Sequence, residues 1–221
     1  MRRLPDLLAD VSGPHGSSLV FDMGDATVSR NVLILVHGRN ASAESVVEWG
    51  KSFLAPTQRV LAPQAVGYSW YPHRFLVSTA HNQPYLDSAL AVLGVLVQSL
   101  SQEGIASSRI VLAGFSQGAC LVSEYVKRFP DKYAGVAIMS GGLIGDEFEV
   151  QTDIDGDLRS TPLYLGADEQ DTHIPWSRVA VTAHYFQAHN AAVELRCYHD
   201  LGHQIHPDAA QFLTSCLNAE F

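Results

Sequence analysis

The chain has 221 residues, 47% of them hydrophobic and 17% charged, which is long enough for one sizeable core and too apolar for an intrinsically disordered chain. Its formal charge is -9 and its 14 lysines and arginines form no basic run, so a nucleic-acid partner is not expected. The three cysteines, Cys120, Cys197 and Cys216, have neither the pairing of a disulfide framework nor the spacing of a zinc site.

The beginning of the chain lacks the pattern of a secretory signal. Arg2 and Arg3 are followed by Pro5 and Asp6 instead of a continuous apolar stretch. No segment approaches the ~18 consecutive apolar residues that cross a membrane. We therefore expect a cytoplasmic protein without stable membrane insertion, folded as a single domain over residues 1–221.

Four uniformly apolar runs predict buried strands at residues 32–36, 110–113, 135–139 and 162–165. Strands of a parallel sheet are apolar at every position because helices cover both of its faces. Residues 193–197 instead alternate apolar and polar side chains, a pattern typical of a strand that is wet on one face. This fifth strand is therefore expected near the edge of the sheet.

Helical patterns lie between and after these strands. Residues 86–100 repeat leucine and valine at spacings of three and four, and residues 116–129, 177–190 and 207–217 are further candidates. Strands that alternate with helices favour right-handed crossover connections. The predicted fold class is α/β, with a mainly parallel sheet and helices on both faces.

Residues 62–84 lack regular periodicity but contain four aromatic residues, Tyr68, Trp70, Tyr71 and Phe75. A loop of this length inside a compact domain is usually functional or disordered. The aromatic residues favour an ordered loop that faces a ligand.

The strongest chemical signal is the segment Gly-Phe-Ser-Gln-Gly at residues 114–118, which fits the pattern G-x-S-x-G between a predicted strand and a predicted helix. Glycines are needed there because the turn is so tight that the central residue adopts a strained backbone. The start of the following helix directs N–H groups and positive partial charge toward a developing anion. Ser116 is therefore expected to be a nucleophile, the alternative being a helix-capping serine in a glycine-rich turn.

A serine nucleophile needs a base, and the base needs an acid to orient it. The expected chain order is serine, acid, histidine. His203 lies in a short glycine-containing loop after the last strand and is our predicted base, whereas His199 and His206 share that loop and remain alternatives. Asp168 and Asp171 both follow the fourth strand, and position alone does not separate them.

An oxyanion needs N–H donors, which are often the largest single catalytic contribution. Gln117 should supply one backbone N–H because it follows the nucleophile, and Arg39 should supply the second from the loop after the first strand. His37 is expected to be a buried structural histidine. These parts all follow strand ends, the edge at which open α/β sheets bind ligands.

From Val32 onward the sequence resembles the phospholipase/carboxylesterase family, small α/β-hydrolases that include acyl-protein thioesterases. Residues 35–39 resemble the family's early strand and oxyanion loop, residues 114–119 match its nucleophile segment, and residues 201–203 resemble its histidine segment. This resemblance implies the α/β-hydrolase fold without a large cap domain.

The family's acid stands in an Asp-x-x-(Val/Ile)-Pro stretch, which here begins at Asp171, so the resemblance favours Asp171 and leaves Asp168 in reserve. A Ser-Trp-aromatic segment borders the family's acyl pocket. The resemblance therefore implies that Trp70 lines the substrate, and we expect Tyr71 and Phe75 to contact it as well. Residues 72–75, Pro-His-Arg-Phe, depart from the family and leave acyl length and leaving group open.

We expect a serine carboxylesterase that cleaves small or short-chain acyl esters through an acyl-enzyme on Ser116, with an acyl thioesterase or lysophospholipase as the alternative. Neither metal nor cofactor is expected. His199, Asp200, His203 and His206 nevertheless keep a metal-dependent hydrolase as a second hypothesis, although their spacing fits no usual zinc pattern. A non-catalytic binding module is the third. The expected partner is a small-molecule acyl ester, and a homodimer is compatible with the sequence, which leaves the oligomeric state open.

Overall fold

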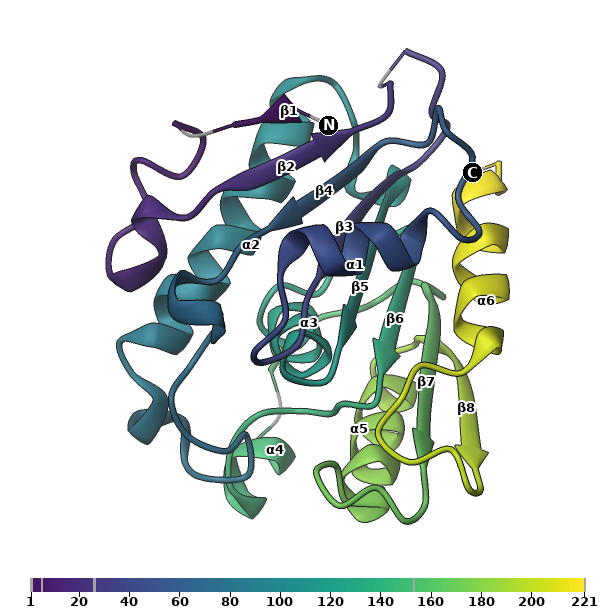
Figure 1. The fold of residues 1–221 in the computed structure, drawn as a ribbon. Coiled ribbons are helices and arrows are strands. Elements are labelled where there is room, and N and C mark those ends of the chain that lie inside the picture. Colours follow the sequence, from purple (N-terminus) through teal and green to yellow (C-terminus); the bar gives the residue numbers. More distant parts are fainter. Residues whose placement is uncertain (1, 5, 26, 153, 221) are drawn as a thin grey trace.

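The computed structural model describes residues 2–4, 6–25, 27–152 and 154–220, and these residues form one eight-stranded sheet. The strand order is β1-β2-β4-β3-β5-β6-β7-β8 (Figure 1). The strands are β1 (Arg2–Arg3), β2 (Val20–Met23), β3 (Val32–Val36), β4 (Val60–Pro63), β5 (Ile110–Phe115), β6 (Gly135–Met139), β7 (Pro162–Asp168) and β8 (Ala192–Tyr198). From β4 to β8 every neighbouring pair is parallel, whereas β1 and β2 pair antiparallel at one edge.

Helices cover both faces of this sheet, as predicted (Figure 1). They are α1 (Ala43–Gly50), α2 (Tyr85–Gln102), α3 (Gln117–Arg128), α4 (Glu147–Gln151), α5 (Trp176–Ala188) and α6 (Pro207–Asn218). Alternate residues of β3 point into different cores: Ile34 packs with α2, α3 and α5, whereas Leu33 and Leu35 pack with α1 and α6. The uniform apolarity of the central strands thus follows from burial on both sides.

The predicted strands and helices are present, with shifted ends. Two of them, β5 and β7, run on to Phe115 and Asp168, beyond the predicted ends at residues 113 and 165. The edge position of β8 is confirmed, but Leu195 and Cys197, on its apolar side, are also exposed. An outermost strand borders solvent along its whole length. The apolar side of β8 is therefore more exposed than its alternating pattern predicted.

We did not predict β1, β2, β4, α1 or α4 from the sequence, and each of them has eight residues or fewer. The aromatic segment 62–84 begins inside β4 and contains two short 3-10 turns, Val66–Tyr68 and Thr79–Asn82. Between β6 and β7 the described residues contain only the five-residue helix α4. No large cap therefore covers the carboxyl edge of the sheet.

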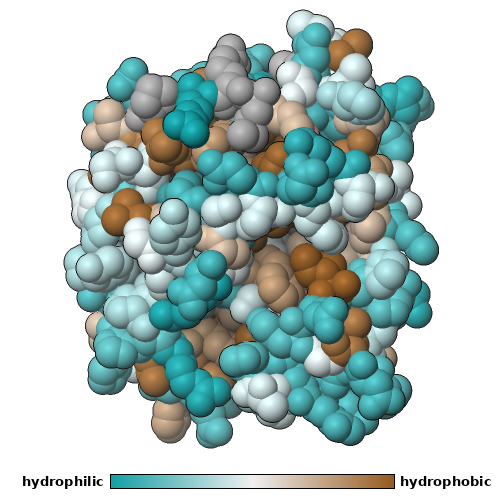
Figure 2. Space-filling view, viewed as in Figure 1, coloured by the Kyte–Doolittle hydropathy of each residue, from teal (hydrophilic) through white to brown (hydrophobic). Residues whose placement is uncertain are grey.

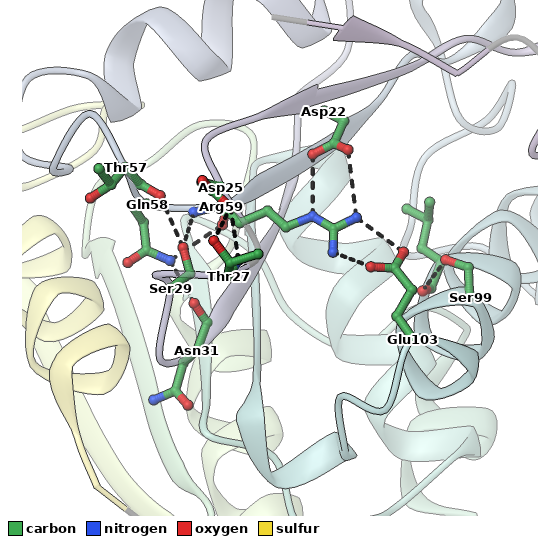
Figure 3. Close-up of polar contacts among 11 residues, drawn as sticks. Asp22, Asp25, Thr27, Ser29, Asn31, Thr57, Gln58, Arg59, Ser99 and Glu103 are labelled. Carbon is green, nitrogen blue, oxygen red and sulfur yellow. Dashed lines mark hydrogen bonds and ion pairs between the residues drawn. The ribbon is translucent and has the colours of Figure 1, made fainter.

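A buried ion cluster connects β2, the start of β4 and the end of α2 (Figure 3). The Arg59 guanidinium, before β4, donates to Asp22 of β2 and to Glu103 after α2. Arg59 and Asp22 are 5% and 6% exposed, so this charge pair is shielded from water. The cluster joins the antiparallel strands to α2 at the end of the molecule remote from the strand ends that carry the predicted site.

Figure 2 shows one face of the molecule coloured by residue hydropathy. Hydrophilic residues dominate the view, and hydrophobic ones form only small groups. Within the described ranges, no helix has both the length and the apolarity needed to cross a membrane.

Candidate active site

Ser116 occupies a tight turn between β5 and α3, with φ 55° and ψ -119°. This left-handed backbone is strained for a residue with a side chain. Close packing around it explains the glycines: a Cβ on Gly114 would overlap the Gly118 carbonyl, and a Cβ on Gly118 would overlap the carbonyl oxygens of Val36 and His37. The turn therefore presses directly against the end of β3.

The structure brings Ser116, His203 and Asp171 into one hydrogen-bonded line. The Ser116 Oγ lies 2.8 Å from His203 Nε2, and His203 Nδ1 lies 2.7 Å from Asp171 Oδ2. A carboxylate only accepts hydrogen bonds, so Nδ1 carries the ring proton and Nε2 is free to accept one from the serine. The Asp171 side chain is 0% exposed and that of His203 is 23% exposed, which places the acid inside and the base at the cavity wall.

Asp171 is itself held in place. Its Oδ1 accepts the backbone N–H groups of His173 and Ile174, at 2.8 and 3.1 Å, which leaves Oδ2 for the imidazole. The His203 ring also packs against Phe115 and His173, with ring centres 5.0 and 4.8 Å away. The orientation of the imidazole is thus fixed on several sides.

Asp168, the reserve acid, faces different groups. It is 1% exposed, and its carboxylate accepts the backbone N–H groups of Gln170, Gly202 and Leu201. The hydrogen bond from Gln170, together with those from Gly202 and Leu201, holds the pKa of Asp168 below its ordinary value. Asp168 therefore joins the acid loop to the loop of His203 without touching the imidazole.

The alternative histidines lie elsewhere. The exposed His199 pairs with Glu169 at 2.8 Å, and the ring of His206 stacks on Tyr198 with centres 3.9 Å apart. In the described part of the chain, no group of three or more His, Cys, Asp or Glu side chains is arranged to hold a metal ion. The four residues of the metal hypothesis are therefore not gathered around a common point.

The loop that contains Arg39 lies against the turn of Ser116. A Cβ added to Gly38 would lie 3.3 Å from the Ser116 Cβ, so the loop with Arg39 touches the turn. Neither the Arg39 nor the Gln117 N–H donates to any acceptor among residues 2–4, 6–25, 27–152 and 154–220. Both residues line the same cavity as Ser116, where free donors can stabilise an oxyanion.

The side chains of Arg39 and Gln117 hold the aromatic loop in place, which we did not predict from the sequence. Gln117 accepts the Trp70 N–H at 2.9 Å and donates to the Tyr71 carbonyl at 2.8 Å. The Arg39 guanidinium donates to the carbonyls of Tyr71, Pro72 and His73, at 2.8, 3.0 and 2.9 Å. The aromatic loop is thus clamped by the side chains of the residues whose N–H groups face Ser116, and no local pattern could have indicated this.

The structure corrects the prediction for Trp70. It is 0% exposed and is not among the residues that line the cavity, so it cannot contact substrate there. Its indole Nε1 donates to the His37 carbonyl at 2.9 Å, and its ring lies between His15 and His37, 5.4 and 5.1 Å from their centres. Trp70 supports the oxyanion loop from below, and His37 is the buried structural histidine that was expected.

Tyr71 and Phe75 do line the cavity, although they are only 2% and 6% exposed. The cavity measures about 700 Å³ and lies above Ser116. It is bordered by residues from the oxyanion loop, the aromatic loop, α3 and the two loops that hold the acid and the base, namely Arg39, Asn40, Tyr71, Pro72, His73, Arg74, Phe75, Ser116, Gln117, Cys120, Thr172, His173, Ile174 and His203.

The chain is similar to known proteins in both sequence and structure. A crystal structure of a phospholipase/carboxylesterase from Dyadobacter fermentans is 34% identical and superposes with a TM-score of 0.86, covering 95% of this chain and 100% of that one. Acyl-protein thioesterase 1 of Kluyveromyces lactis is 26% identical over 138 residues, 60% of each chain. Lysophospholipase-like protein 1 of Mus musculus is 29% identical over 159 residues, 63% of this chain and 60% of that one.

The chain thus spans about three fifths of the length of these two curated relatives. The family model for phospholipase/carboxylesterase proteins matches residues 24–220, which include every element described here from β3 to α6. With the α/β-hydrolase fold in place, this match shows that the chain belongs to the phospholipase/carboxylesterase family.

Proposed function

We propose that this chain is a serine carboxylesterase that hydrolyses small or short-chain acyl esters through an acyl-enzyme on Ser116. The observation that supports it most is the hydrogen-bonded line from Ser116 Oγ through His203 to the buried Asp171, with steps of 2.8 and 2.7 Å. Such a line lets a serine lose its proton as it attacks a carbonyl carbon.

In the first half-reaction His203 Nε2 takes the Ser116 proton while Oγ forms a bond to the ester carbonyl. The imidazolium that results faces the Asp171 carboxylate, which stabilises its charge. The carbonyl oxygen becomes an oxyanion, and the N–H groups of Arg39 and Gln117 are the donors placed to bind it. His203 then gives its proton to the departing alcohol, which leaves an acyl group on Ser116.

In the second half-reaction water replaces the alcohol. His203 removes a proton from the water molecule, and the water oxygen attacks the acyl carbon. The Ser116 oxygen then leaves and takes back the proton from the imidazolium. The carboxylic acid is released and the resting state returns. The scheme uses only side chains and backbone of this chain.

A small acyl ester suits the dimensions of the cavity. Two of its lining residues, Tyr71 and Cys120, are only 2% and 1% exposed, so this part of the cavity ends against the packed core. A cavity that ends there supports short acyl groups over long ones. The names of the relatives, an acyl-protein thioesterase and a lysophospholipase-like protein, keep thioester and lysophospholipid cleavage as the alternative.

The test is Ser116→Ala. Loss of the nucleophile should lower kcat on a 4-nitrophenyl ester of a short acid by at least about 10³-fold. It should also abolish covalent labelling by a fluorophosphonate probe. Ser123→Ala is the matched control, because Ser123 is a fully buried serine of α3, the helix that begins directly after Ser116. Turnover that survives in Ser116→Ala would refute the proposal, and a series of acyl lengths with oxygen and sulfur leaving groups separates the carboxylesterase from its alternatives.

A further inference from the structure

The cavity above Ser116 is lined by cations but by no carboxylate side chain. Arg39 and Arg74 contribute guanidinium groups, and His73 and His173 contribute imidazoles beside that of His203. The chain as a whole carries a formal charge of -9, so the charge of this lining is opposite in sign to the net charge of the protein. Two of these four residues, His73 and Arg74, belong to residues 72–75, the segment that departs from the family in sequence.

Among the described residues, no acid forms an ion pair with the Arg39 guanidinium. Its guanidinium is held by three backbone carbonyls, which bind the donors but bring no net negative charge. Behind the cavity wall, the Arg178 guanidinium is also held by backbone carbonyls. Arg178 is 8% exposed and donates to the Leu143 and Gly145 carbonyls, with its guanidinium 5.7 Å from the Phe75 ring centre. Arg39 thus contributes a positive charge at the cavity wall, and Arg178 contributes a second one behind it.

Arg74 stands on an immobilised stretch of backbone. Asn82, which is 0% exposed, accepts the His73 N–H at 2.8 Å and donates to the Arg74 carbonyl at 3.3 Å. The next residue, Phe75, is anchored by the N–H of Gly145 at 2.8 Å. Within the described ranges the Arg74 guanidinium has no ion pair, so it is positioned on the cavity wall with its donors available.

We propose that the cavity selects esters that carry an anionic group, a carboxylate or a phosphate, which binds the Arg74 guanidinium while the ester carbonyl lies at Ser116. Arg39 and Arg178 support the binding through their charge. A guanidinium fits the geometry of either anion because its N–H groups can donate in pairs. The inference rests on the proposed esterase function and adds the substrate class.

The experiment compares each anionic ester with a neutral ester of the same skeleton. Monomethyl succinate against dimethyl succinate places the charge on the acyl side, and 4-acetoxybenzoate against its methyl ester places it on the alcohol side. The measured quantity is the ratio of kcat/KM for the anionic ester to that for its neutral counterpart, each corrected for its rate of hydroxide hydrolysis. Binding of succinate and of inorganic phosphate, measured by calorimetry, separates the two kinds of anion and needs no turnover.

We expect the ratio to favour the anionic ester in at least one pair and to fall about tenfold in Arg74→Gln, since one charged hydrogen bond is lost. Arg74→Lys should restore part of the preference because it keeps the charge. Arg30→Gln is the matched control, since Arg30 precedes β3 at the opposite edge of the sheet and pairs with Glu220. It should leave the ratio unchanged.

The inference is overturned if Ser116-dependent turnover shows no preference in either pair, or if Arg74→Gln keeps the preference of the unaltered chain. Absence of succinate and phosphate binding to the unaltered chain overturns it as well, whatever the turnover. Failure of the esterase function itself has a different signature, because then the neutral esters would not be cleaved either.

Discussion

Asp168 ends β7 and Asp171 lies in the loop after it, and the surroundings of each aspartate give it a different role. Asp171 faces the His203 imidazole and two backbone N–H groups, whereas Asp168 faces only backbone N–H groups of two loops. Both are buried carboxylates near the end of the same strand. Only Asp171 can stabilise a charged imidazole, and only Asp168 can fix the distance between the loops.

Replacing each aspartate by asparagine should therefore have unequal consequences. Asp171→Asn is expected to lower kcat by about 10³- to 10⁴-fold, because an amide neither selects the required tautomer nor offsets the imidazolium charge. Asp168→Asn keeps one acceptor oxygen and should cost much less in kcat. Steady-state kinetics on one neutral ester compares them, with circular dichroism to confirm that both variants fold. Equal losses would contradict the assignment.

Two buried histidines make the fold sensitive to acid. His15 accepts the Val66 N–H and donates to the Trp70 carbonyl, and His37 accepts the Ala65 N–H. Both rings are 0% exposed, and burial lowers the pKa of each below its ordinary value. Protonation would add a proton to a nitrogen that already faces a donor, so the fold requires both rings to be neutral.

The sign of the effect on stability follows from linkage. As pH falls below about 6.5, the unfolded chain binds protons at these positions before the folded chain does, so the free energy of unfolding decreases. We expect it to be lower at pH 5.5 than at pH 7.5 in urea titrations. His199→Gln is the control, because His199 is exposed and should leave the difference intact. A free energy of unfolding that rises or stays level as the pH falls would show that the buried rings do not behave in this way.

At the scale of elements, the junction of β5 and α3 depends on the absence of side chains. Gly118 packs against the carbonyl oxygens that end β3, whereas Gly94 of α2 has no atom within 4 Å of the place where a Cβ would stand. The two glycines thus offer a matched pair, one in a crowded turn and one in an uncrowded helix.

Gly118→Ala is expected to lower the free energy of unfolding by about 1–3 kcal/mol and to reduce kcat, because the added methyl group must push β3 away from the turn of Ser116. Gly94→Ala should raise the free energy of unfolding by about 0.5–1 kcal/mol, since alanine is the better helix former. Urea denaturation measures both changes. If Gly118→Ala were as stable and active as the unaltered chain, close packing between Gly118 and the end of β3 would be contradicted.

The whole molecule assembles its site from loops that are remote in sequence. Ser116, Asp171 and His203 follow β5, β7 and β8, and Arg39 follows β3. Parallel strands bring all these ends to one edge of the sheet, where ligands of open α/β sheets bind. Catalytic roles for these residues, the single domain, a homodimer and a cytoplasmic location all stay predictions.

What the sequence determined by itself is local. Apolar runs located the central strands, since burial on both faces requires an apolar residue at every position. The glycines around Ser116 located the strained turn, because such a turn requires small neighbouring residues. The serine, acid and histidine were then placed in chain order, with family resemblance needed to prefer Asp171 over Asp168.

Only the tertiary structure decided the contacts between distant segments. It buried Trp70 beneath the oxyanion loop, placed the Arg39 guanidinium on the carbonyls of the aromatic loop, and gave Asp168 the task of joining two loops. Each contact spans 30 or more residues of chain. Such pairs depend on how strands and helices pack, and packing leaves no periodicity in the residues that it brings together.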